Sequence, residues 1–165
     1  MAKRYLILIR HAQQDRSQPS HDRGLTELGK RQAKNAAQFL HQHWAGQKIR
    51  LESSTKRRCL ETAREILDLF SGTQLEINPL LTESNHDESF HAFHKRIRSF
   101  LQKWQQSTDQ YTIACSHSDW IPEAVRLLCN IDCDIHHASI IEITLEETDE
   151  ALLQYSISLR RDAEA

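Results

Sequence analysis

Short apolar runs alternate along this chain with longer segments in which apolar residues recur at every third or fourth position. The short runs, at residues 5–9, 49–53, 75–77 and 111–115, have the length of strands. The longer segments, at 26–44, 55–70, 89–106 and 119–129, have the period of an α-helix. Strands that alternate with helices predict an α/β fold with a mostly parallel sheet and helices on both faces.

Individual residues set the expected ends of the helices. Thr26 is suited to cap the first helix, and Gly72 is suited to stop the second. Pro122 is compatible with the fourth helix because it falls in the first turn. The third segment has the clearest helical pattern, with one apolar face formed by Phe90, Phe93, Ile97, Phe100, Leu101 and Trp104.

Two alternating runs at residues 139–145 and 152–159 end the pattern, and an acidic stretch at 146–150 joins them. They predict an antiparallel pair at the edge of the sheet. No repeat and no linker rich in Pro, Gly or Ser divides the 165 residues. We therefore expect residues 1–165 to form a single domain, a three-layer sandwich with helices on both faces of one sheet.

Composition argues against several classes of partner. Lys and Arg total 21 against 23 Asp and Glu, and the net charge of −2 predicts no binding to nucleic acid or to an anionic membrane. The apolar run at 5–9 is too short for a signal peptide or a membrane span, so we expect a cytoplasmic protein. In that compartment the four scattered cysteines are expected to remain reduced thiols.

Charged residues and histidines gather just after the predicted strands. Arg10 and His11 follow the first strand, Arg58 comes shortly after the second, Glu83 follows the third, and His117 follows the fourth. In a parallel sheet these carboxyl ends meet at one edge, which is where ligands bind. We expect the five residues to share one site.

These residue types suit the transfer of a phosphoryl group. A neutral imidazole can attack phosphorus and form a phosphohistidine. The rigid fork of an arginine pairs with phosphoryl oxygens, and a second histidine adds another donor. A carboxylic acid beside the leaving oxygen can supply its proton. The strand ends therefore predict a phosphoryl-transfer site.

Four motifs occur here in the order found in a known family. Residues 10–12 read RHA where that family has Arg-His-Gly, and residues 25–33 read LTELGKRQA, matching every fixed position of Leu-Thr-x-x-Gly-x-x-Gln-Ala. Residues 53–63 match Ser-x-x-x-x-Arg-Ala-x-x-Thr-Ala with Cys59 in place of one alanine, and residues 116–118 read SHS for Ser-His-Gly. Over nearly its whole length the chain resembles the histidine phosphatase superfamily, also called phosphoglycerate mutase-like.

The resemblance implies a role for each residue at the strand ends. His11 is the phosphorylated nucleophile, Glu83 is the proton donor, and His117 both contacts the reacting group and helps to hold it. Arg10 and Arg58 bind the phosphate together with His117. The resemblance implies no metal ion and no other cofactor.

The chain departs from the family pattern in the loop after the first strand and at two glycines. Ala12 and Ser118 replace glycines, and Gln14 and Ser17 stand where the family often has other polar residues. We expect Gln14, Ser17 and His21 to form a possible substrate loop.

Other residues allow competing interpretations of the proton donor and of the helix at 89–106. Asp87 or Glu88 could supply the proton in place of Glu83. Glu88 also stands at ligand-like spacing with His91 and His94, although a polar stripe on the helix surface is the simpler interpretation of these histidines.

A zinc-binding interaction protein is a further alternative, because four ligand types fall within nine residues: Cys129, Cys133, His136 and His137. Their spacing fits no common zinc motif.

Arg57 could compete with Arg58 for phosphate, but it is better interpreted as a charge on the helix surface. No Cys is followed by Arg six residues later, and the four glycines form neither a P-loop nor a dinucleotide motif.

The sequence therefore predicts a metal-independent phosphatase that forms a phosphohistidine intermediate. Its expected partner is a phosphorylated small molecule or a phosphoprotein, with phosphohistidine on a protein or a small phosphate ester as the reacting group. A phosphomutase and a catalytically weak phosphate-binding module are the alternatives. A mutase is disfavoured because 165 residues leave little room for the inserted segments of larger mutases.

Overall fold

Six strands form one mixed sheet in the order β3-β2-β4-β1-β5-β6 within residues 3–147 and 153–160, the part of the chain that the computed structural model describes. Their bounds are β1 Arg4–Arg10, β2 Ile49–Ser53, β3 Leu75–Ile77, β4 Tyr111–Ser116, β5 Ile140–Glu147 and β6 Leu153–Arg160. Strands β3, β2, β4 and β1 run parallel, whereas β5 is antiparallel to both β1 and β6. The predicted parallel sheet with an antiparallel edge is confirmed.

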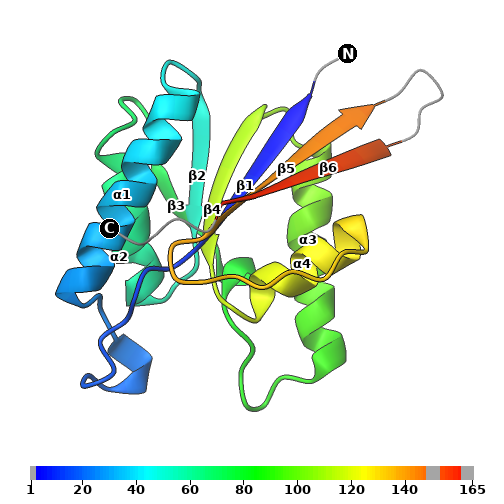
Figure 1. Ribbon diagram of the computed structural model, residues 1–165. Coiled ribbons are helices and arrows are strands. Elements are labelled where there is room, and N and C mark those ends of the chain that lie inside the picture. The colour runs from blue at the N-terminus through cyan, green and yellow to red at the C-terminus, as the bar shows by residue number, and fades with distance from the viewer. Residues whose placement is uncertain (1–2, 148–152, 161–165) are drawn as a thin grey trace.

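Four helices cover the two faces of this sheet: α1 Glu27–Trp44, α2 Arg57–Leu67, α3 Phe90–Gln106 and α4 Trp120–Cys129. Figure 1 shows α1 and α2 on one face and α3 and α4 on the other. Within the described residues, no helix combines the length and the apolarity that crossing a membrane requires.

The alternation of side chains along β1 supplies both apolar cores. Ile7 and Ile9 pack in the core under α1 and α2, whereas Leu6 and Leu8 pack in the core under α3 and α4. All four side chains are fully buried. Burying each contributes about 1.5–3 kcal/mol, so the central strand anchors both helical layers.

The ends of the helices follow the sequence signals with one exception. The Thr26 hydroxyl caps α1 by accepting a hydrogen bond from the Gly29 amide at 2.9 Å, as predicted. Helix α2, expected over 55–70, spans only Arg57–Leu67, because the amides of Leu69 and Phe70 bond three residues back and tighten the chain into a turn. Phe70 is nonetheless buried and completes the apolar stripe. The fold also contains two short 3₁₀ helices that were not predicted, Ser20–Asp22 and Pro79–Leu81.

The C-terminal pair of strands was predicted at 139–145 and 152–159, and β5 and β6 confirm it. Residues 148–150 of the expected acidic connection, and Leu152, lie outside the described residues.

Gly29 lets α1 pack closely against the loop that follows β1. A Cβ atom placed on Gly29 would lie 2.2 Å from the carbonyl oxygen of Gln13, far inside van der Waals contact. The same carbonyl accepts a hydrogen bond from the Thr26 amide at 3.0 Å. Helix α1 thereby fixes the backbone two residues after His11.

Candidate active site

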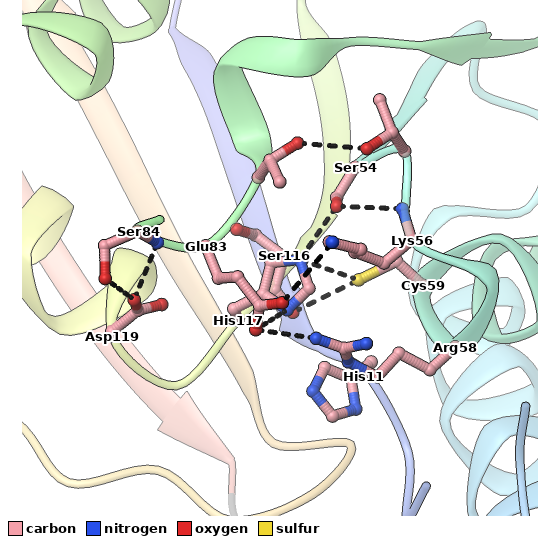
Figure 2. A network of polar contacts seen from close by, with 12 residues as sticks. His11, Ser54, Lys56, Arg58, Cys59, Glu83, Ser84, Ser116, His117 and Asp119 are labelled. Carbon is pink, nitrogen blue, oxygen red and sulfur yellow. Dashed lines mark hydrogen bonds and ion pairs between the residues drawn. The ribbon is translucent and has the colours of Figure 1, made fainter. Parts of the chain in front are cut away.

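Strands β1 and β4 place two histidines side by side at their carboxyl ends. Arg10 pairs with Ser116 in the parallel register, and the His11 amide donates to the Ser116 carbonyl at 3.0 Å. The rings of His11 and His117 follow directly, with centroids 5.3 Å apart. Figure 2 shows both rings beside Arg58 and Glu83. We call His11, Arg10, Arg58, Glu83 and His117 the His-Arg cluster.

The His11 ring is held in one tautomer. Its Nδ1 lies 2.8 Å from the carbonyl oxygen of Ala12, and because a carbonyl only accepts, Nδ1 carries the proton. Nε2 therefore keeps its lone pair. Burial lowers the pKa of His11 well below its usual value, and the charges of His117, Arg58 and Arg10 reinforce this against the opposing effect of the Ala12 hydrogen bond. At neutral pH the ring is uncharged.

Glu83 is the anion that Arg58 and His117 contact in this structure. The buried Arg58 donates to its Oε2 at 2.6 Å, and Nδ1 of His117 lies 3.5 Å from the same oxygen. Lys56 Nζ lies 3.9 Å from Oε1. Burial acts to raise the pKa of Glu83, but the Arg58 hydrogen bond and the charges of His117, Arg58 and Lys56 outweigh it, so the pKa is lowered. The carboxyl group is ionised at neutral pH.

Three buried donors of the cluster have no hydrogen-bond partner within the described residues: Arg10 Nε, Arg58 Nε and His117 Nδ1. A buried donor left unsatisfied costs about 1–3 kcal/mol. Buried donors on three neighbouring side chains suit a ligand with several acceptor oxygens, such as an oxyanion.

His117 is oriented by buried neighbours from the β2 end and from α2. Its Nε2 lies 2.7 Å from the Ser54 hydroxyl and 3.6 Å from Sγ of Cys59. The Ser54 amide in turn donates to the Cys115 carbonyl on β4 at 3.0 Å. When the Ser54 hydroxyl donates to Nε2, the proton of His117 sits on Nδ1, facing Glu83.

His137 lies beside the His-Arg cluster, although the sequence suggested it only as one ligand of the zinc alternative. Its Nε2 lies 3.3 Å from Nη2 of Arg10, and its ring centroid is 5.9 Å from that of His11. Burial, followed by the charges of Arg10, Arg16 and His136, lowers the pKa of His137 to about 4. Because β5 is antiparallel to β1, the segment before β5 reaches the carboxyl end of β1. The predicted antiparallel edge was therefore the sequence signal that could have placed His137 near Arg10.

The zinc alternative finds no support in the geometry. Among the residues that the structure describes, no three His, Cys, Asp or Glu side chains are arranged to hold a metal ion. His137, one of the four suggested ligands, contacts Arg10 instead. The described part of the chain contains no disulfide.

Residues of the predicted substrate loop lie outside the His-Arg cluster. Gln14 pairs with Leu25 in an isolated bridge, Ser17 is exposed and bonds to Asp15, and His21 is exposed on the first 3₁₀ helix. The structure gives none of the three a described contact with His11, so their role in binding substrate stays a prediction.

Arg16, in the same loop, does act on the cluster. Its charge contributes to lowering the pKa of Arg10, after burial, and that of His137. The loop after β1 therefore adds a cation near the edge of the site.

The two positions where glycines are replaced accept their side chains without strain. Neither Ala12 nor Ser118 is among the described residues with positive φ. The Ala12 amide donates to the Thr62 hydroxyl at 3.1 Å, and its methyl group is fully buried. Glycine is not required at either place.

The competing arginine and carboxylates are held elsewhere. Arg57 forms a surface ion pair with Glu61 at 2.7 Å, as the interpretation of a surface charge predicted. Glu88 pairs with Arg96 at 2.8 Å and Asp87 is exposed, whereas Glu83 contacts the cluster directly.

The histidines on α3 also follow their simpler interpretation. His94 pairs with Glu123 at 3.0 Å, and His91 is exposed on the helix surface.

Comparison with known proteins gives a consistent result. The model of the histidine phosphatase superfamily (branch 1) matches residues 6–87, which contain the motifs around His11, Arg58 and Glu83. A search of curated proteins finds no significant match to the sequence.

Many solved structures have the same fold. A phosphoglycerate mutase from Bacillus anthracis superposes with a TM-score of 0.79 at 17% identity, covering 98% of this chain and 94% of that one. A mycobacterial glucosyl-3-phosphoglycerate phosphatase complexed with VO3 gives 0.76 at 18% identity, with 96% and 99% covered. The protein histidine phosphatase SixA complexed with tungstate gives 0.72 at 17% identity, with 92% and 94% covered. These likenesses extend over nearly the whole described fold.

Proposed function

Because the chain belongs to the histidine phosphatase superfamily, we propose that it is a phosphatase whose His11 accepts the phosphoryl group of a phosphohistidine protein or of a small phosphate ester. One observation carries the proposal. The buried His11 ring keeps its Nε2 lone pair available, and its charged neighbours Arg10, Arg58 and His117 each carry a buried donor without a hydrogen-bond partner. Two structures with this fold hold the oxyanions VO3 and tungstate, which supports an anion site.

In the first step the Nε2 lone pair of His11 forms a bond to phosphorus as the bond to the leaving atom breaks. Arg10, Arg58 and His117 stabilise the charge on the phosphoryl oxygens, so the chemistry needs no metal ion. The leaving atom takes a proton from Glu83.

In the second step a water molecule attacks the phosphorus and gives a proton to Glu83. The P–N bond breaks, its electron pair returns to Nε2, and inorganic phosphate leaves. The protein ends in its starting state.

Glu83 can act as the acid because the substrate changes its surroundings. Burial acts to raise its pKa, but the hydrogen bond from Arg58 and the charges of His117, Arg58 and Lys56 together outweigh burial and lower it. A phosphoryl group that pairs with Arg58 displaces the carboxylate and places two anions close together, which raises the pKa of Glu83. Substrate binding therefore favours the protonated form.

The test is hydrolysis of 4-nitrophenyl phosphate with EDTA present, in the natural protein and in His11→Asn. We expect release of inorganic phosphate by the natural protein, and a loss of at least about 10³-fold in His11→Asn. An acid-labile, base-stable phosphoryl adduct should form in the natural protein and be absent from the variant. Equal activity in both proteins would contradict the mechanism.

The same experiment separates the alternatives. A phosphate-binding module would bind inorganic phosphate without turnover. A phosphomutase would transfer the phosphoryl group to another hydroxyl group of its substrate and release little inorganic phosphate.

A further inference from the structure

A pocket of about 450 Å³ opens next to the His-Arg cluster. Two segments of its wall directly follow cluster residues, since Ser84 comes after Glu83 and Ser118 comes after His117. We call this pocket, lined by Ser84, Asn85, Glu88, Phe90, Phe93, Ser118, Asp119, Pro122 and Glu123, the acidic pocket.

The position of the acidic pocket suits the leaving group of the proposed reaction. In an in-line displacement the leaving atom departs on the side opposite His11, next to the proton donor. Figure 2 shows Ser84 and Asp119 beside Glu83, on the side away from Arg58. A group bound to the leaving atom would therefore extend toward these two residues.

Asp119 gives the pocket an uncompensated negative charge. Its Oδ2 accepts two hydrogen bonds of 2.9 Å from the amide and the hydroxyl of Ser84. Its Oδ1 is buried and has no hydrogen-bond partner, and the described residues offer it no cationic partner. Although it stands at the N-cap of α4, its side chain makes no capping bond.

The other two carboxylates of the wall already have partners. Glu88 pairs with Arg96 at 2.8 Å, and Glu123 pairs with Arg126 at 2.6 Å and with His94 at 3.0 Å. They leave Asp119 as the carboxylate with capacity to bind a donor. A second anion in this pocket would meet the uncompensated charge of Asp119.

Phe90 adds an apolar surface to the same wall. Its side chain is 69% exposed although it begins an amphipathic helix whose other aromatic residue here, Phe93, is 5% exposed. The Phe90 ring lies against that of His94, with centroids 4.0 Å apart. An exposed aromatic face beside a carboxylate suits a flat apolar group that carries a positive charge.

The His-Arg cluster and the acidic pocket together form a site that is cationic at one end and anionic at the other. From this geometry we infer that the substrate is a phosphate ester whose leaving group has a flat apolar part and a protonated amine, with the amine on Asp119. This inference rests on the proposed phosphatase function. It disfavours leaving groups with a carboxylate or a second phosphate.

Three 4-alkylphenyl phosphates provide the test: phosphorylated tyramine, phosphorylated 4-ethylphenol, and phosphorylated 3-(4-hydroxyphenyl)propionate. Their phenols have similar acidity, and the far end of the molecule is cationic, neutral or anionic. We expect kcat/KM to be about tenfold higher for the cation than for the anion, with the neutral ester between them. The ratio should shrink as salt is raised, since screening weakens charge contacts.

Two substitutions identify the responsible residue. Asp119→Asn keeps an acceptor for Ser84 but removes the charge, and should bring the cation-to-anion ratio close to one. Asp68→Asn removes an exposed carboxylate from the C-terminal end of α2 and should leave the ratio unchanged. An unchanged ratio in Asp119→Asn would overturn the assignment.

Binding separates the inference from the proposed function. The dissociation constants of the three esters, measured by calorimetry with the inactive His11→Asn, should follow the same order. Equal constants, or tightest binding of the anion, would overturn the inference. Ordered binding to His11→Asn with no turnover by the natural protein would uphold the pocket and overturn the phosphatase.

Discussion

The His-Arg cluster and the acidic pocket lie next to each other but are built differently. The cluster residues follow the ends of strands, and His11, Arg58 and His117 are at most 4% exposed. The pocket is lined by residues from the loop after Glu83 and from the first turns of α3 and α4. Backbone pairing thus fixes the His-Arg cluster, whereas the packing of two helices shapes the acidic pocket. We expect substitutions in the cluster to affect the chemistry and those in the pocket to affect the choice of substrate.

After the loss of His11 itself, the largest effect should come from removing a cluster arginine. Arg58→Ala should lower kcat/KM for an aryl phosphate by roughly 10²–10³-fold, because a buried donor fork to the phosphoryl oxygens is lost. Arg58→Lys should recover only part of this, since an ammonium group cannot pair with two oxygens at once.

The neighbouring Arg57 is the matched control. It pairs with Glu61 on the surface, so Arg57→Ala should change kcat/KM by less than about twofold. Similar losses in the two alanine variants would show that the cluster does not bind the phosphoryl group as described.

Glu83 should show opposite effects on binding and on turnover. Glu83→Gln removes the anion that Arg58 now holds, so vanadate should bind several-fold tighter. It also removes the proton donor, so kcat should fall by roughly 10²-fold. Calorimetry and steady-state kinetics measure the two effects separately.

Glu65→Gln, with the same change of charge on α2, should leave both quantities near their natural values. Weaker vanadate binding in Glu83→Gln would mean that the carboxylate helps to hold the anion.

His137 should make stability depend on pH. Its pKa is about 4 in the fold against 6.5 in an unfolded chain, chiefly because of burial. Above pH 6.5 it is neutral in both states; between pH 6.5 and 4 only the unfolded chain binds the proton. The free energy of unfolding should therefore fall by about 1–2 kcal/mol over that window, allowing for partial exposure.

Urea unfolding at pH 7 and at pH 4.5 tests this effect. His137→Gln should lose less stability on acidification than the natural protein, whereas His21→Gln, at an exposed position, should behave like the natural protein. Identical pH dependence in His137→Gln and the natural protein would contradict the assigned burial effect.

The smallest effect should come from the rim of the acidic pocket. Phe90→Ala should lower kcat/KM for phosphorylated tyramine about threefold and leave thermal stability nearly unchanged, because the side chain is 69% exposed. Ile77→Ala, an exposed apolar position elsewhere, should change neither. A loss of stability without a change in kcat/KM would assign Phe90 to the fold.

Much of the fold followed from local patterns. The two-residue alternation and the apolar runs located the strands, and Thr26 marked the start of α1 as the structure has it. Helix α2 ended earlier than its apolar stripe because Phe70 reaches the core from a turn. Periodicity reports which side chains are buried, and a turn can continue a buried stripe without helical hydrogen bonds.

Some residues of the candidate site could likewise be identified from local patterns, and others could not. His11, Arg58 and His117 could be identified because each stands at a fixed distance from a strand end, and parallel pairing brings such ends together. His137 could not, because its contact with Arg10 depends on β5 pairing beside β1 across more than 120 residues. The Glu83 contacts with Arg58 and His117 likewise depend on the loop after β3 folding over the sheet edge.

The sequence by itself determined the order of strands and helices, the residues at the strand ends and the chemistry those residues can perform. These properties are local, since they follow from the period of apolar residues and from the side chains next to each strand. The tertiary structure alone decided the burial of His11, the anion held by Arg58 and the uncompensated charge of Asp119. Each of these depends on contacts between segments far apart in the chain. Burial and ion pairing created by such contacts decide which side chains are charged and which charges are compensated.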